Sequence, residues 1–124
     1  MFNYRVLCIG SKNKIIKGRH FYKHSSAEKF KNRSRLEFDY IKIFKINHIK
    51  IGDDEYRHEY RGFTFYELSK NLSYGLLDNS NNVYKIFSGS FYNLLSSIDM
   101  TILRGSNYDN LDSYTFLGEV WPES

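Results

Sequence analysis

The chain has 124 residues and a mass of 14.8 kDa, which is typical of one domain, so we expect a single domain over residues 1–124. Hydrophobic residues make up 41% and aromatic residues 18% of the chain, enough apolar surface for a core, and this excludes wholesale disorder. No segment approaches the roughly 20 apolar residues that a membrane-spanning helix requires, and the N-terminal segment lacks the pattern of a signal peptide. We therefore expect a cytoplasmic protein with no membrane partner.

Cysteine usage agrees with that compartment. Cys8 is the single cysteine, lies in an apolar run and cannot form an intramolecular disulfide, so we expect a small buried side chain in a reducing environment. The 11 Tyr and 10 Phe accompany many Ile, Asn and Lys, all encoded by AT-rich codons. This composition suggests an AT-rich genome, such as that of a phage or mobile element.

The charge is distributed unevenly along the chain. Residues 1–61 contain 15 Lys+Arg and 7 Asp+Glu, a net charge of +8, whereas residues 62–124 contain 3 and 7, a net charge of −4. Such asymmetry indicates an acidic partner, either nucleic acid or an acidic protein, or a homo-oligomer formed through opposite charge patches. A basic face that is merely solvated is the simpler alternative.

The N-terminal third predicts a strand, a loop and a helix. Residues 2–9 alternate and then become apolar on both faces, which predicts a strand buried on both sides. Residues 12–17 are rich in lysine and predict a loop or short edge strand, with a bend at Gly18. Ser25 and Glu28 have the spacing of a capping box, which predicts a short helix from about Ser26 to Asn32.

The middle of the chain predicts strands and one helix. Residues 36–51 are β-branched and aromatic with two slips in their alternation, so we expect strands with bulges or a turn near residues 45–48. A turn at residues 52–54 leads to a strand at residues 56–60. Thr64 and Glu67 repeat the capping-box spacing and predict a helix over residues 65–72.

The last third predicts a loop at residues 78–82, a strand at 83–87 and a helix that Ser90 caps and that turns Leu94, Leu95 and Ile98 inward. Closing strands are expected at residues 100–103 and 114–121. The fold class that follows is α+β, with an antiparallel or mixed sheet and two to three short helices packed on it.

The four histidines, His20, His24, His48 and His58, suggest acid–base chemistry but match no metal motif, so we expect neither a metal nor a cofactor. With basic side chains such as Lys23, Arg57 and Arg61 they could form a small metal-independent ribonuclease, which we retain as the enzymatic alternative. Residues 63–87 weakly resemble a helix-turn-helix, but their second segment carries one basic residue, which argues against that interpretation.

The strongest functional signal is the basic run from Lys12 to Arg35, which holds nine Lys and Arg against one acid, Glu28. Basic residues interleaved with aromatic residues can bind nucleic acid, and the same residues dominate protein interfaces. The predicted binding residues are Lys17, Arg19, Phe21, Tyr22, Lys23, Lys29, Arg33 and Arg35.

The leading hypothesis is therefore a non-enzymatic binding protein that docks this run, with Lys42, Lys45 and Lys50 nearby, on an acidic macromolecule. Stoichiometric inhibition or immunity against a toxin or nuclease is one use of such a face. A self-associating structural protein is the other non-enzymatic alternative.

Overall fold

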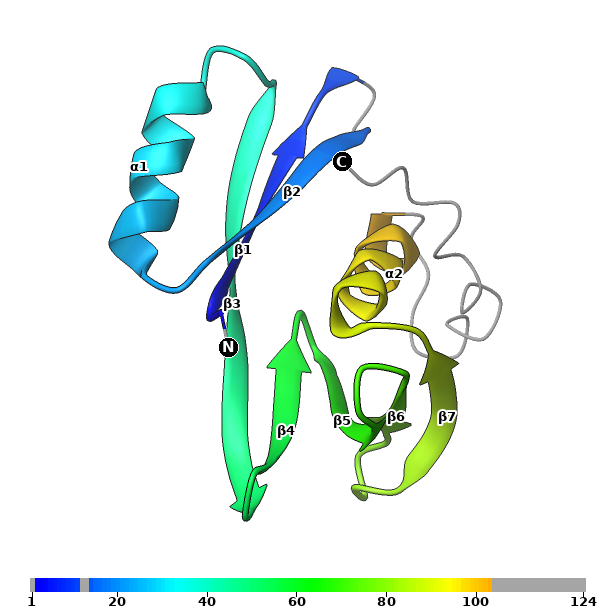
Figure 1. Ribbon diagram of the computed structural model, residues 1–124. Helices are drawn as coiled ribbons and strands as arrows, with labels where there is room; N and C mark the ends of the chain where they lie inside the picture. Colours follow the sequence, from blue (N-terminus) through cyan, green and yellow to red (C-terminus); the bar gives the residue numbers. More distant parts are fainter. Residues whose placement is uncertain (1, 12–13, 104–124) are drawn as a thin grey trace. The chain divides into compact units, whose positions relative to one another are not determined.

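The computed structural model describes residues 2–11 and 14–103 (Figure 1). Its elements, in chain order, are β1 (Tyr4–Ile9), β2 (Ile15–Phe21), α1 (His24–Ser34), β3 (Tyr40–Gly52), β4 (Glu55–Tyr60), β5 (Phe63–Ser69), β6 (Ser73–Leu77), β7 (Val83–Ser88) and α2 (Phe91–Leu103). The predicted α+β class, with an antiparallel sheet and short helices, is confirmed.

Within the described ranges, hydrogen-bonded neighbours follow the strand order β2-β1-β3-β4-β5-β6-β7. The chain groups into two compact units, Met1–Asn47 and a second unit that begins at His48, so strand β3 contributes residues to both. The single domain over residues 1–124 stays a prediction.

In the first unit, β1 is the central strand and pairs antiparallel with β2 on one side and with β3 on the other. Helix α1 lies against one face of these strands (Figure 1). The core between helix and sheet consists of Val6, Cys8, Ala27, Phe30 and Ile41. β1 is buried on both faces, as its apolar sequence predicts, and its cysteine is fully buried.

Residues 15–17 of the lysine-rich segment belong to the edge strand β2, as one of the two predicted alternatives has it. The bend expected at Gly18 is wrong, because Gly18 lies within β2 opposite Leu7. A Cβ atom at Gly18 would come within 3.0 Å of the Arg5 guanidinium. The glycine therefore makes room for a buried arginine rather than turning the chain.

Helix α1 begins earlier than the capping box at Ser25 predicts. Lys23 occupies the N-cap position, makes no side-chain capping bond, and accepts the amide hydrogen of Ala27 through its carbonyl oxygen. Glu28 instead lies 3.6 Å from the ring of His24, four residues earlier on the helix surface. The capping box is therefore wrong, although the helix and the inward direction of Phe30 are confirmed.

Strand β3 is continuous through the residues where a turn was expected, near 45–48. The buried residues of this strand are Ile41 and Ile46, an odd number of positions apart, so the alternation slips between them, within the first unit. Residues 36–39, predicted as part of a strand, form a turn in which Leu36 is 95% exposed.

In the second unit, the turn at Asp53 and Asp54 and the strand that follows are confirmed as the β3–β4 connection and β4. The predicted helix over residues 65–72 is wrong, because β5 pairs antiparallel with both β4 and β6. Phe63 and Phe65 are buried with a two-residue period, whereas Leu68 and Leu72 are exposed. The helix-turn-helix alternative is excluded with it, because residues 63–88 form β5, β6 and β7.

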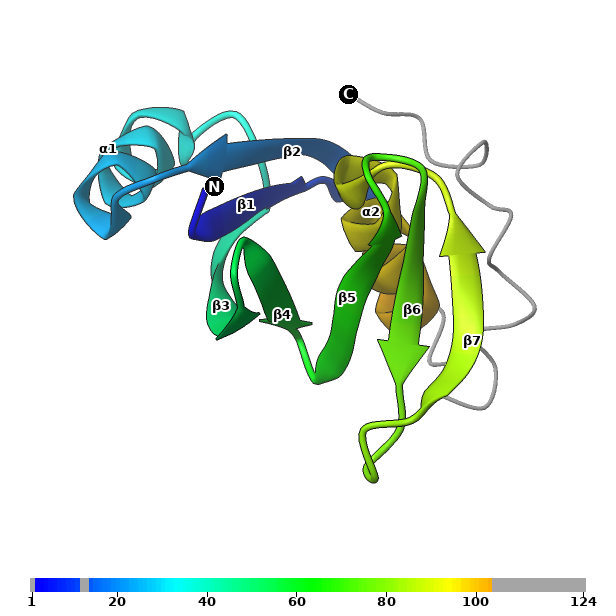
Figure 2. The ribbon, with the colours of Figure 1, turned by 60° about the horizontal axis from the view of Figure 1, so that its bottom comes forward.

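Helix α2 covers one face of β5, β6 and β7, with the ring of Phe91 against those of Phe65 and Tyr74 (Figure 2). Its N-terminus is confirmed, since the Ser90 hydroxyl accepts the amide hydrogen of Asn93 at 3.1 Å. Leu94, Leu95 and Ile98 are fully buried, as predicted. Residues 100–103 end this helix instead of forming a strand, and the strand expected at residues 114–121 lies outside the described residues.

Alanine substitutions of the two serines that were predicted to cap helices, Ser25 and Ser90, test which of them forms a capping hydrogen bond. Ser90→Ala removes the acceptor for a backbone amide at the start of α2 and should lower the free energy of unfolding by about 1 kcal/mol. Ser25→Ala removes no capping bond and should leave stability within about 0.5 kcal/mol of the wild type. Urea denaturation followed by circular dichroism measures both values, and a larger loss for Ser25→Ala would contradict the assignment.

Candidate basic binding face

The basic face defined here consists of the exposed side of β2 and α1 in the first unit, with the corner that joins them. Lys17, Arg19 and Phe21 alternate along β2 and therefore share one side of the sheet. Their partners on β1 are Cys8, Val6 and Tyr4, two of which belong to the core beneath α1. These three predicted binding residues thus border the helix along the edge of the sheet.

The Arg19 side chain contacts aromatic rings of both β2 and α1. Its guanidinium carbon lies 5.1 Å from the ring centre of Phe30 and 6.0 Å from that of Phe21. The two rings are themselves 5.6 Å apart. A cation over two aromatic faces is attracted by both, so Arg19 and Phe21 hold β2 to α1 as well as facing solvent. Phe21 is consequently engaged in packing against the core.

The corner between β2 and α1 carries the most exposed ring of the predicted set. Tyr22 is 68% exposed, and Lys23 next to it is exposed at the N-cap of the helix. The side-chain amide of Asn3 donates a hydrogen bond of 3.1 Å to the carbonyl oxygen of Tyr22. This bond to the backbone holds the corner while leaving both side chains in solvent.

The outer surface of α1 is polar and positively charged. Ala27, Phe30 and Ser34 face the sheet and are buried. Lys29 and Arg33, one turn apart, share the exposed outer flank of the helix, rotated about 100° and 60° away from Phe30. Arg35 is exposed immediately after the helix, at its C-cap.

Neutral polar residues that the sequence interpretation missed complete this surface. Ser25, Ser26 and Asn32 are exposed on the same side of α1 as the two basic residues. The sequence predicts a helix from about Ser26 to Asn32, which leaves Ser25 outside the helix and Asn32 at its end. The observed bounds, His24–Ser34, place both residues on this face.

The predicted residues therefore fall into two adjoining groups, one along β2 and one on the outer side of α1. Residues 1–47 hold 12 Lys+Arg and 3 Asp+Glu, a net charge of +9. Across the described ranges, no acidic side chain forms an ion pair with any of the six predicted basic residues. Lys42 pairs with Leu7 in the register of β1 and β3, on the opposite sheet face, so it does not join this group.

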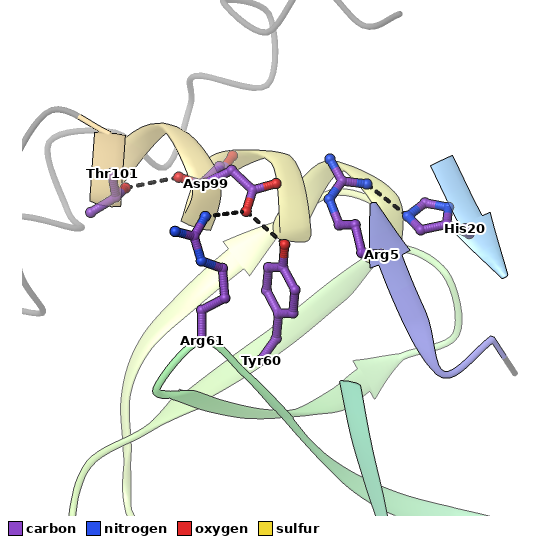
Figure 3. A network of polar contacts seen from close by, with 7 residues as sticks. Arg5, His20, Tyr60, Arg61, Asp99 and Thr101 are labelled. Atoms are coloured by element: carbon purple, nitrogen blue, oxygen red, sulfur yellow. Dashed lines mark hydrogen bonds and ion pairs between the residues drawn. The ribbon is translucent and has the colours of Figure 1, made fainter. Parts of the chain in front are cut away.

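A buried cation lies on the other face of the first unit's sheet (Figure 3). Arg5 is fully buried, and its Nη1 atom donates a 2.7 Å hydrogen bond to Nε2 of His20. The His20 ring stacks on Phe2 at 3.9 Å. Burial, together with the charge of Arg5, lowers the pKa of His20 to about 3, so this ring is a neutral acceptor near pH 7.

A glycine substitution tests this arrangement. Gly18→Ala places a methyl group 3.0 Å from the buried Arg5 guanidinium and should lower the free energy of unfolding by about 1–3 kcal/mol. Gly52→Ala is the control, because its methyl group would meet the Glu55 side chain at an ordinary 3.4 Å, and should change stability by less than about 0.5 kcal/mol. Equal effects of the two substitutions in urea denaturation would contradict the tight contact at Gly18.

The second unit has a separate buried charge on α2 (Figure 3). Asp99 is fully buried and accepts hydrogen bonds from the Tyr60 hydroxyl at 2.7 Å and from Nη1 of Arg61 at 2.9 Å. Arg61 and Gly62 form the two-residue turn between β4 and β5, and both have positive φ angles, 49° and 91°. The ion pair offsets the backbone strain at Arg61 and joins α2 to this hairpin.

Two histidines of the second unit contact each other directly. The Nδ1 atoms of His48 and His58 are 2.8 Å apart, so one ring must donate and the other accept. His58 is 6% exposed and packs against the rings of Phe65 and Phe91. Burial, and next the neighbouring His48, lowers the pKa of His58 to about 4. Like His20, it is held neutral near pH 7, which suits packing better than proton donation.

This arrangement predicts a loss of stability in acid. A histidine with a lowered pKa contributes its full stability above the unfolded pKa of 6.5, and that contribution falls as the pH drops from 6.5 to about 4. For His58 the loss amounts to about 3 kcal/mol. His58→Phe fills the same aromatic site without a titrating group, so its unfolding free energy should depend less on pH than that of the wild type.

Urea denaturation at several pH values between 8 and about 4.5 measures this difference. His24→Gln is the control, because the His24 side chain is 57% exposed, and it should retain the wild-type pH dependence. An unchanged pH profile in His58→Phe would show that His58 titrates normally in the folded protein.

Within the described ranges, no group of three or more His, Cys, Asp or Glu side chains is arranged to hold a metal ion. Neither of the two described helices has the length and apolarity needed to cross a membrane. Comparisons of the chain with protein-family models, with curated proteins and with solved structures found no match. The functional interpretation therefore depends on the geometry and charge of the chain itself.

Proposed function

We propose that the protein is a non-catalytic binding protein that docks the basic face of its first unit on an acidic macromolecule, either nucleic acid or an acidic protein. The observation that carries this proposal is the concentration of solvent-accessible cations without an acidic ion-pair partner on β2, on α1 and at the corner between them. Unpaired charges of one sign attract an oppositely charged partner and increase its association rate.

The positions of the cations support docking rather than chemistry. Lys29 and Arg33 project from an exposed flank of a helix that Phe30 holds against the sheet, so their backbone positions are fixed by that packing. Of the histidines considered for catalysis, His20 and His58 have pKa values far below neutrality. The metal-independent ribonuclease stays an untested alternative, and no contact in the described ranges favours it.

Stoichiometric inhibition or immunity against a toxin or nuclease is the use that fits a small protein of this kind. Such a protein blocks its target by occupying an acidic surface of that target, and needs no catalytic residue of its own. The proposal places it in the cytoplasm, because its one cysteine is buried and unpaired, and in a phage or mobile element, because of its AT-rich codon composition.

Affinity capture from the source cell tests the proposal directly. The full-length protein is compared with Lys29→Glu/Arg33→Glu, which reverses two charges on the outer side of α1, and with Lys70→Glu/Lys85→Glu. The control pair has the same total charge but changes lysines of the second unit. We expect the α1 variant to lose at least about tenfold in the recovered partner, since each buried charge contact contributes about 1–3 kcal/mol, and the control to retain it.

Nuclease treatment before capture distinguishes nucleic acid from protein as the partner. Equal recovery by both variants would overturn the proposal, because binding would then not depend on the face. Loss of self-association in the α1 variant, measured by light scattering at low salt, would favour a homo-oligomer held by opposite charge patches instead.

A further inference from the structure

The outer side of α1 has a composition that distinguishes between classes of acidic partner. Its exposed residues are Ser25, Ser26, Lys29, Asn32 and Arg33, all polar, with no apolar side chain between the helix ends. One carboxylate borders them, that of Glu28, which is 44% exposed and lies 3.6 Å from the His24 ring. Stable protein interfaces are organised around buried apolar or aromatic anchors. Exposed apolar or aromatic side chains flank this surface at its two ends, Tyr22 before the helix and Leu36 after Arg35, but none lies within it. Cations and small hydrogen-bonding groups of this kind are matched to phosphates and base edges.

The aromatic residues of the face argue against single-stranded nucleic acid. Proteins that bind single strands stack successive bases on exposed rings. Phe21 and Phe30 are packed on each other and on Arg19, so neither offers a free ring face on this surface. Tyr22 alone is strongly exposed there, and one ring cannot form a stacking platform for several bases.

The dimensions of α1 suit a double helix. Its 11 residues span about 16 Å, and the exposed cations Lys23 and Arg35 at its two ends are about 18 Å apart. The major groove of B-form DNA is about 12 Å wide and admits one α-helix, so cations beyond both ends of α1 can reach the two bordering phosphate backbones. The major groove of A-form RNA is too narrow for this insertion.

We propose, as an extension of the proposed function and dependent on it, that α1 binds duplex DNA with its outer side in the major groove. Lys23 and Arg35 neutralise phosphates on the two sides of the groove. Asn32 and Arg33 face the base edges, where asparagine pairs with adenine and arginine with guanine through their N7 atoms and exocyclic groups. Lys29 lies one turn before Arg33 and contributes a further cation to the same surface.

Fluorescence anisotropy with the full-length protein tests this inference. The probes are a mixed-sequence DNA duplex of two helical turns, the RNA duplex of the same sequence, and each single DNA strand. We expect the DNA duplex to bind at least about tenfold more tightly than the others at moderate salt. Lys23→Ala/Arg35→Ala should flatten the dependence of log K on log salt concentration by about 2, one for each lost phosphate contact.

A second measurement locates the groove. Replacing the purines of the duplex by 7-deazapurines removes the N7 acceptors from the major groove and leaves the phosphates unchanged, so wild-type affinity should fall about tenfold. Asn32→Ala/Arg33→Ala should bind both duplexes with nearly equal affinity. An unchanged wild-type affinity for the modified duplex would overturn major-groove binding, as would equal affinity for the RNA duplex.

The inference and the proposed function fail in different ways. If no DNA binds but Lys29→Glu/Arg33→Glu still loses a captured protein partner, the DNA inference is wrong and the docking face stands. If neither DNA nor any captured partner depends on these two residues, both are wrong. Lys70→Glu/Lys85→Glu serves as the control for total charge throughout.

Discussion

The contact of Phe30 with the sheet determines how the first unit presents its charge. Phe30 is the one large apolar side chain directed inward from α1, and it meets Phe21 of the edge strand under the guanidinium of Arg19. This contact determines which side of the helix is buried and which side is exposed to solvent. When Phe30 packs on the sheet, the flank of the helix that carries Lys29 and Arg33 is left in solvent. The basic face is thus a consequence of core packing in its own unit.

Each of the two units contains a buried charged side chain that is stabilised by hydrogen bonds to neighbouring side chains. Arg5 is paired with a histidine that burial keeps neutral, and Asp99 is paired with the hydroxyl of Tyr60 and the guanidinium of Arg61. A buried charge without hydrogen-bonding partners would cost several kcal/mol. These clusters therefore account for titratable groups that might otherwise be taken for an active site, and they leave the exposed cations of β2 and α1 as the clearest functional feature.

Local sequence patterns predicted the elements whose residues alternate without interruption. The apolar run of β1, the alternation of β4, the aspartate turn before it and the Ser90 cap all depend on neighbours within a few residues, so sequence alone was sufficient. The same patterns failed for β5, where a capping-box spacing outweighed strand-forming residues such as Phe63 and Phe65. Pairing with strands on both sides decided that segment, and such pairing has no local signature.

The candidate site was predicted in part for the same reason. The cations of residues 17–35 are evident from composition, but their division between the border of β2 and the outer side of α1 required the register and the start of the helix. Sequence by itself thus determined the fold class, the charge asymmetry and the exposed basic run. Tertiary structure decided the continuity of β3, the role of Gly18 and the neutral state of His20 and His58, because each depends on side chains brought together from distant parts of the chain.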